Sequence, residues 1–214
     1  MIILIGGEKG GPGKTTIATN LAAIRTIEKG DTLLVDTDEQ PTSSYWCSLR
    51  EEKQVSPRVS SIQKRGKAVR TEVIGLKEKY ADIIIDAGGR DSPELRGALL
   101  VADKAVFPLR PSQFDLWTLG RLDTLVDQAR EINEDLQAFI LINQASPNPG
   151  VKEAQEAREY ISDIDNISLM KSFTSERIAF RRAAIHGMSV IEYKPVDQRA
   201  VDEIMSIYQE IFND

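Results

Sequence analysis

The chain has 214 residues, of which 41% are hydrophobic and 28% charged, a composition typical of a globular domain and not of a disordered or fibrous chain. Its single cysteine, Cys47, excludes an internal disulfide framework, and no apolar run approaches the length that crosses a bilayer. The formal net charge is −6, so any binding of nucleic acid requires a local basic patch.

Short β-type runs alternate with helix-like segments along the chain. The expected strands, several of them continuously apolar as in parallel strands covered on both faces, are Ile2–Ile5, Thr32–Val35, Asp82–Asp86, Lys104–Leu109, Ala138–Asn143 and Ile167–Met170. The expected helices are Thr16–Glu28, Ser43–Glu52, Val69–Tyr80, Pro93–Ala102, Leu116–Asn133, Val151–Ile164, Glu176–Ile185 and Val196–Phe212. This alternation predicts an α/β fold in one domain, with a mostly parallel twisted sheet and helices on both faces.

A glycine-rich turn separates the first expected strand from the first expected helix. It reads Lys9, Gly10, Gly11, Pro12, Gly13, Lys14, Thr15, Thr16. This layout is that of a phosphate-binding loop, because glycines let amide groups point inward at a polyphosphate and the helix adds free N–H groups and its positive dipole end. Lys14 supplies a charge for the β- and γ-phosphates, and Thr15 supplies a hydroxyl for Mg²⁺.

One position departs from the general phosphate-loop spacing: Glu8 stands where the pattern has its first glycine, and Lys9 precedes the double glycine. This form resembles the deviant Walker A loop of the ParA/MinD ATPase superfamily, in particular the short ParA/ParF-type plasmid partition proteins. The resemblance implies nucleotide contacts from all eight loop residues, ATP/ADP and Mg²⁺ as cofactors, and an ATP-bound homodimer. It implies catalytic roles for Lys9, which would reach the nucleotide of the partner subunit, and for Lys14.

Acidic residues end two of the expected strands, at the sheet edge where α/β proteins bind ligands. Asp86 closes an apolar run, which suits a carboxylate that holds Mg²⁺ together with Thr15. Asp36 and Asp38 lie in a segment that resembles the family signature D-x-D-P-Q, with Glu39 in place of the proline. The resemblance gives Asp38 the orientation of the attacking water and both aspartates a place around the metal. Taken alone, either acidic cluster could instead cap a helix.

The resemblance continues in the second half of the chain. The segment from Asp103 to Ser112 is similar to the strand and proline-rich turn of the small partition ATPases. Asn143 matches the asparagine that closes a family strand and contacts the adenine. A second adenine loop would then comprise Phe173, Thr174 and Ser175.

Two cationic groups are candidates for binding DNA. The first, in a span without acidic residues, comprises Arg58, Lys64, Arg65, Lys67 and Arg70. The second is preferred because family members use basic residues of their C-terminal half, and it comprises Arg177, Arg181, Arg182 and Lys194. Either group could instead be a solvated face or pair with neighbouring carboxylates.

These features predict a cytoplasmic, nucleoid-associated ATPase that partitions DNA, binds DNA without sequence preference and is stimulated by a ParB-like centromere-binding protein. Two alternatives stay open: a ParA-like positioner of a protein assembly, such as a microcompartment, chemoreceptor cluster or DNA-transfer complex, and a P-loop biosynthetic ligase or kinase. No helix-turn-helix domain is expected before the loop. The acidic segment after Arg199 disfavours a membrane-binding tail of the MinD type.

Overall fold

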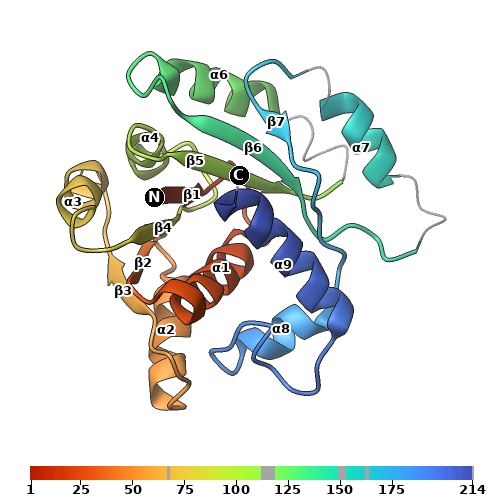
Figure 1. Cartoon of the computed structure of the whole chain (residues 1–214). Helices are drawn as coiled ribbons and strands as arrows, with labels where there is room; N and C mark the ends of the chain where they lie inside the picture. The colour runs from red at the N-terminus through yellow and green to blue at the C-terminus, as the bar shows by residue number, and fades with distance from the viewer. Residues whose placement is uncertain (67, 112–118, 149–152, 162–163, 214) are drawn as a thin grey trace.

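The computed structural model describes residues 1–66, 68–111, 119–148, 153–161 and 164–213. Within these ranges, seven parallel strands form one sheet in the order β3-β2-β4-β1-β5-β6-β7 (Figure 1). The strands are β1 (Ile2–Ile5), β2 (Thr32–Asp36), β3 (Ser60–Gln63), β4 (Asp82–Asp86), β5 (Lys104–Leu109), β6 (Gln137–Ile142) and β7 (Ser168–Leu169). The predicted α/β fold with a parallel sheet is therefore confirmed.

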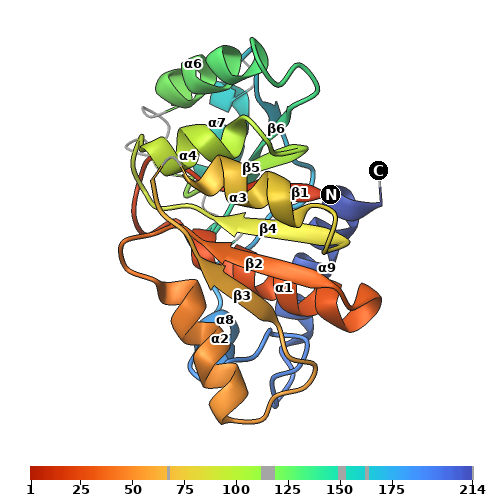
Figure 2. The same cartoon turned by 90° about the vertical axis from the view of Figure 1, so that its left-hand side faces the viewer.

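Helices cover both faces of the sheet, as the two views together show (Figures 1 and 2). One face packs against α3 (Ala68–Leu76), α4 (Pro93–Leu99), α6 (Leu119–Arg130) and α7 (Glu153–Ile161). The other packs against α1 (Lys14–Lys29), α2 (Thr42–Glu52), α8 (Ile178–Ala184) and α9 (Gln198–Phe212). Each face of the sheet has its own hydrophobic core, and the side chains of β1 alternate between them. Ile2 and Leu4 lie in the first core, and Ile3 and Ile5 lie in the second.

One strand was missing from the prediction. β3 reads Ser-Ser-Ile-Gln, is partly exposed, and pairs only with β2 because it lies at the edge of the sheet. Its short, polar sequence gives no apolar run to recognise. The other predicted elements agree to within a few residues, apart from positions 116–118, 151, 152, 162 and 163 of two predicted helices, which lie outside the described residues.

The amphipathic face of α9 is used inside the chain. Its apolar residues pack into the core beside α1, and Tyr208 donates to Glu28 at 2.7 Å while accepting from Arg25 at 3.0 Å. The Arg25 guanidinium also lies over the Phe212 ring, 4.5 Å from its centroid. The apolar face of this helix is therefore buried in the core. Among the described residues, no helix is both long and apolar enough to span a membrane.

Strand pairing brings the chemically important chain ends together. β1 lies between β4 and β5, and its last residue, Ile5, is in register with Asp86 of β4. Asp86 is also in register with Asp36, the last residue of β2. The loop that leaves β1 therefore starts directly beside two aspartates at the carboxyl edge of the sheet.

Candidate nucleotide-binding site

The loop between β1 and α1 forms a cradle of backbone. Gly13 precedes α1 in the left-handed region with φ 86°, and a side chain there would also collide with the amide of Asn143. The first-turn amides of α1 have no acceptor within the helix, so they face the loop with the positive end of the helix dipole. This local geometry fits the phosphates of a nucleotide.

Lys14 brings the charge of the cradle. Its side chain is only 7% exposed, and its Nζ donates to the Lys9 carbonyl oxygen at 2.6 Å. Burial lowers the pKa of the Lys14 ammonium, and the charges of Asp86 and Asp38 oppose that shift. A desolvated ammonium next to free amide groups is a strong attractor for a polyphosphate, because few water molecules compete for it.

Two buried carboxylates flank the start of α1. Asp86 and Asp36 are 2% and 1% exposed, and the Thr15 hydroxyl is hydrogen-bonded to Asp86. Burial raises the pKa of Asp86 to about 7, and the Asp36 charge acts in the same direction. Within the described residues no group of three or more His, Cys, Asp or Glu could hold a metal. One carboxylate beside a hydroxyl and the phosphate cradle nevertheless suits Mg²⁺, which keeps several waters and phosphate oxygens as ligands.

Asp36 already has backbone partners. Its Oδ2 accepts from the Ser44 amide in the first turn of α2 at 2.8 Å, and its Oδ1 accepts from the Asp38 amide at 3.2 Å. The helix-capping alternative thus describes what Asp36 does here, and its role toward the metal stays a prediction.

Asp38 lies half-buried at the edge of a cleft of about 410 Å³. The cleft is also lined by Gly10 of the phosphate loop and by Gly88 and Gly89, which follow β4. A Cβ on Gly88 would stand 3.2 Å from Asp38 Oδ2, and one on Gly89 would stand 2.6 Å from the Gly10 amide nitrogen. Because these two glycines have no side chains, the segment after β4 can lie against Asp38 and against the phosphate loop. Sequence reasoning missed them, although two adjacent glycines one residue after an acid-ended strand were a signal.

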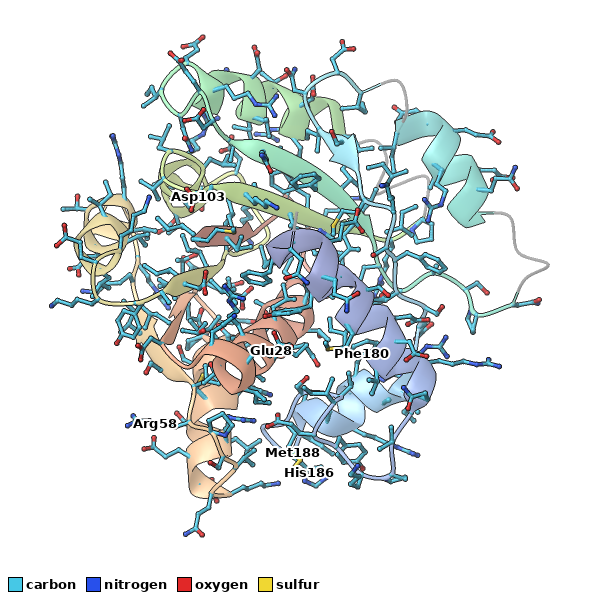
Figure 3. The ribbon with its side chains drawn as sticks, viewed as in Figure 1. Glu28, Arg58, Asp103, Phe180, His186 and Met188 are labelled. Atoms are coloured by element: carbon cyan, nitrogen blue, oxygen red, sulfur yellow. The ribbon has the colours of Figure 1, made fainter. Side chains whose placement is uncertain are left out.

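A second, smaller pocket of about 160 Å³ opens on the other side of the loop. It is lined by Thr16, Asn143, Thr174 and Ser175, together with Ile17, Gln144, Glu176, Phe180 and three arginines, Arg110, Arg177 and Arg181. Phe180, labelled in Figure 3, is the residue that α8 contributes to this lining together with Arg181. Four residues predicted to contact the nucleotide thus meet around one pocket. Phe173 does not line it; the ring is 42% exposed and lies under Arg158.

Hydrogen bonds join this pocket to the phosphate loop. The buried Asn143 side chain donates to the Pro12 carbonyl oxygen and accepts from the Thr174 hydroxyl. Glu203 of α9, which no sequence pattern singled out, accepts from the Ser175 amide and hydroxyl at 3.1 Å each. The same carboxylate accepts from Arg177 at 2.6 and 3.0 Å. The wall of the pocket therefore depends on one acidic residue of the last helix.

The predicted DNA-binding cations are in different situations. Arg177 is held in a partly buried ion pair with Glu203, whereas Arg181 is 72% exposed and only loosely paired with Glu176 at 3.6 Å. Arg182 and Lys194 are exposed. In the alternative group, ion pairs join Arg58 to Glu51 at 3.6 Å and Lys64 to Glu72 at 2.8 Å, and Lys67 lies outside the described residues.

The chain is similar to known proteins over nearly its whole length. The maintenance of carboxysome distribution protein A of Halothiobacillus neapolitanus is 26% identical over 212 residues, covering 98% of this chain and 95% of the relative. Two solved structures share the fold. A protein of Borrelia burgdorferi described as a plasmid partition protein, bound to AMPPNP, gives a TM-score of 0.73 at 19% identity, with 99% of this chain and 98% of that chain covered. The septum site-determining protein MinD of Pyrococcus horikoshii, complexed with Mg-ADP, gives 0.74 at 16% identity, with 99% and 95% covered.

A family match covers the whole site described above except its last helix. Residues 3–190 match the family described as CobQ/CobB/MinD/ParA nucleotide binding domain. The match includes the phosphate loop, both acid-ended strands and the strand that ends before Asn143. The chain belongs to the CobQ/CobB/MinD/ParA nucleotide-binding family.

Proposed function

We propose that the chain is an ATP-hydrolysing switch that dimerises with ATP and positions a protein assembly along DNA. The observation that carries the ATPase proposal is the buried Lys14 ammonium in a glycine cradle, beside Asp86 and with Asp38 at the adjoining cleft. This arrangement supplies a phosphate site, a metal ligand and a carboxylate that can orient water.

Each residue contributes a separate part of the reaction. Lys14 and the loop amides bind the phosphates, while Thr15 and Asp86 would hold Mg²⁺, with Asp36 beside them. The metal, when bound, neutralises charge that develops on the transferring phosphoryl group. Asp38 lies beside the loop and orients the attacking water, with Gly88 and Gly89 leaving space for it. Asn143, Thr174 and Ser175 line the base pocket.

Dimerisation would place Lys9 at the nucleotide of the second subunit. Support comes from the position of Lys9 in the loop, directly before Gly10, which lines the cleft. Hydrolysis would then separate the two subunits, so the dimer would persist until its ATP is hydrolysed. The variant Lys9→Ala should keep nucleotide binding in the monomer and lose ATP-driven dimerisation in analytical ultracentrifugation.

The cargo is proposed from the relatives. The carboxysome distribution protein is similar over nearly the full length of both chains, which favours a positioner of a protein assembly over a plasmid partition protein. Partition of DNA with a ParB-like partner is the second candidate, supported by the shared fold of the Borrelia protein and by 23% identity to the sporulation initiation inhibitor protein Soj of Bacillus subtilis. Deletion of the gene decides: dispersed assemblies support the first, and loss of a replicon supports the second.

DNA would be the track on which the dimer is held. Of the preferred cations, Arg181, Arg182 and Lys194 are the exposed ones, and Arg182 lines a groove of about 350 Å³ with Arg199. Binding of unrelated duplex DNA in the presence of ATP should weaken steeply with salt, because phosphate contacts release counterions. The double variant Arg181→Ala, Arg182→Ala should lose this binding in an electrophoretic shift. Unchanged affinity would move the DNA site to the other cationic group.

The biochemical test is ATP hydrolysis by the purified chain, with and without duplex DNA. DNA-stimulated release of phosphate supports the switch. Turnover that requires a small carboxylic acid or amine, and that DNA does not affect, would instead identify a biosynthetic ligase.

A further inference from the structure

The loop that carries Asp38 lacks the proline of the related signature, because Glu39 occupies that position. Proline would fix φ of residue 39 and restrict residue 38 to extended conformations. Another restraint is present in this chain. Arg65 Nη2 donates to the Glu39 carbonyl oxygen at 2.7 Å and approaches the Asp38 carbonyl oxygen at 3.4 Å. One guanidinium therefore contacts the carbonyl oxygens of both Asp38 and Glu39.

The backbone of Arg65 is itself held in place. The Lys64 amide donates to the Asp36 carbonyl oxygen at 2.9 Å, which continues the pairing of β3 with β2 beyond the last strand residue. The Gly66 amide donates to Glu94 Oε1 in the first turn of α4 at 2.6 Å. The turn after β3 thus connects the Asp38 loop with the start of α4, the helix that follows the Gly88–Gly89 segment along the chain. Arg65 also lines the cleft of Asp38.

We propose that Arg65 is a positioning residue for ATP hydrolysis, which fixes the Asp38–Glu39 segment so that the Asp38 carboxylate faces the cleft. The proposal rests on the proposed ATPase function. A guanidinium suits this task because its planar, rigid set of donors can hold two carbonyl groups with little loss of entropy. Arg65 thereby supplies the rigidity that a proline supplies through its ring. It belongs to the cationic span considered for DNA, but its guanidinium is turned onto the loop.

Removal of Arg65 should separate catalysis from binding. In Arg65→Ala, kcat for ATP should fall roughly tenfold to a hundredfold, the range expected when a reacting group is displaced by about 1 Å. The affinity for a fluorescent ATP analogue should change by less than about twofold, because the hydrogen bonds of Arg65 go to the Asp38–Glu39 segment and not to Lys14. Arg65→Lys should recover part of the rate, since an ammonium keeps the charge and can donate to these carbonyl groups but sits on a more flexible stem and lacks the rigid planar guanidinium.

Restoring the proline provides a stricter test. Within the described residues the Glu39 amide donates no hydrogen bond, so Glu39→Pro removes none. In the Arg65→Ala background, Glu39→Pro should therefore return most of the lost kcat. A double variant as slow as Arg65→Ala would overturn the proposal, because loop rigidity would then not be what Arg65 supplies.

The matched control is Arg58→Ala. Arg58 belongs to the same cationic span, lies at the edge of the molecule beside α2 (Figure 3) and pairs only loosely with the exposed Glu51. The change removes the same charge and should leave kcat unaltered. If both arginine variants slow hydrolysis equally, net charge explains the effect and the proposal is overturned. An equal loss of ATP affinity and kcat in Arg65→Ala would overturn it too, since Arg65 would then support binding.

Hydrogen exchange tests Arg65 independently of turnover. The Gln40 amide donates to Asp38 Oδ1 at 3.0 Å and so reports the order of this loop. Without nucleotide, its exchange should be at least several-fold faster in Arg65→Ala than in wild type or Arg58→Ala. Equal exchange in all three proteins would overturn the proposal. Wild-type protein without ATPase activity but with this exchange difference would refute the proposed function alone and leave Arg65 as the restraint on the loop.

Discussion

The two halves of the proposed nucleotide site, one for the phosphates and one for the base, are built in different ways. The phosphate half comes from one contiguous loop, and its lysine, hydroxyl and amides are placed by backbone geometry between β1 and α1. The base half is assembled from segments far apart in sequence, where Asn143 is bonded to Pro12 across 131 positions and Glu203 holds Ser175 and Arg177. Changes in the first half should therefore act through charge and backbone space, and changes in the second half through lost side-chain hydrogen bonds.

The largest effect is expected at the centre of the phosphate half. Lys14→Ala should weaken ATP affinity at least about a hundredfold, because a charge in a desolvated site interacts far more strongly than one in water. Titration calorimetry measures the loss. The exposed Lys29 at the other end of α1 provides the control, as Lys29→Ala should bind ATP normally. Near-normal binding by Lys14→Ala would mean that backbone amides alone make the phosphate site.

Backbone space should produce the next effect. Gly89→Ala puts a methyl group 2.6 Å from the Gly10 amide nitrogen and from the Lys9 carbonyl carbon, so the phosphate loop must shift. ATP affinity should fall roughly tenfold or more, in line with the sensitivity of preorganised sites to small displacements. In Gly120→Ala the new methyl group meets open space on α6, so this control should stabilise the chain by about 0.5–1 kcal/mol. Equal ATP affinity in both variants would contradict the close approach.

The base half should respond more weakly and selectively. The glutamine of Glu203→Gln has nearly the same shape as glutamate but no charge. It therefore weakens the charge-assisted hydrogen bonds to Arg177 and Ser175, each worth about 1.5–3 kcal/mol. ATP affinity should fall about fivefold to tenfold while affinity for tripolyphosphate stays constant. Glu210→Gln is the control, because Glu210 holds the Lys171 and Ser172 amides outside the pocket. If tripolyphosphate binding falls as well, the two halves are not separable.

The smallest effect concerns stability and pH. Burial raises the pKa of Asp86 to about 7, so between its ordinary value and about pH 7 the folded chain binds a proton that the unfolded chain lacks. Stability contributed by this group therefore decreases as pH rises through that window. Without metal or nucleotide at pH 8, Asp86→Asn should melt roughly 2–4 °C above wild type, the shift that about 1 kcal/mol produces in a chain of this size. The difference should shrink as pH falls through this window, so it should be smaller at pH 5 than at pH 8.

Asp127→Asn controls for the change of net charge, since Asp127 is exposed on α6. An equal gain in this variant would assign the effect to charge and not to burial of Asp86.

The same division explains what the sequence could predict. The phosphate loop and the acid-ended strands β2 and β4 follow from local spacing, because backbone geometry turns such strings directly into a site. The fold class followed from alternating elements, and its agreement with family members is confirmed. β3 was not predicted because three of its four residues are polar. The role of Arg65 was not predicted either, since its partner at Glu39 lies 26 positions away. Glu203 gave no signal, because an acid on the polar side of an amphipathic helix is ordinary until its partners are known.

The hydrogen bond from the Lys14 ammonium to the Lys9 carbonyl oxygen has a consequence for how fast and how tightly a nucleotide is taken up. This bond links the start of the glycine-rich loop to its end, so the loop keeps its open conformation without a bound nucleotide. A phosphate that binds has only to replace the Lys9 carbonyl oxygen as the acceptor of Lys14, and the loop need not fold around it. Most of the conformational entropy that ordering the loop costs is thus lost during folding and does not weaken the binding of nucleotide.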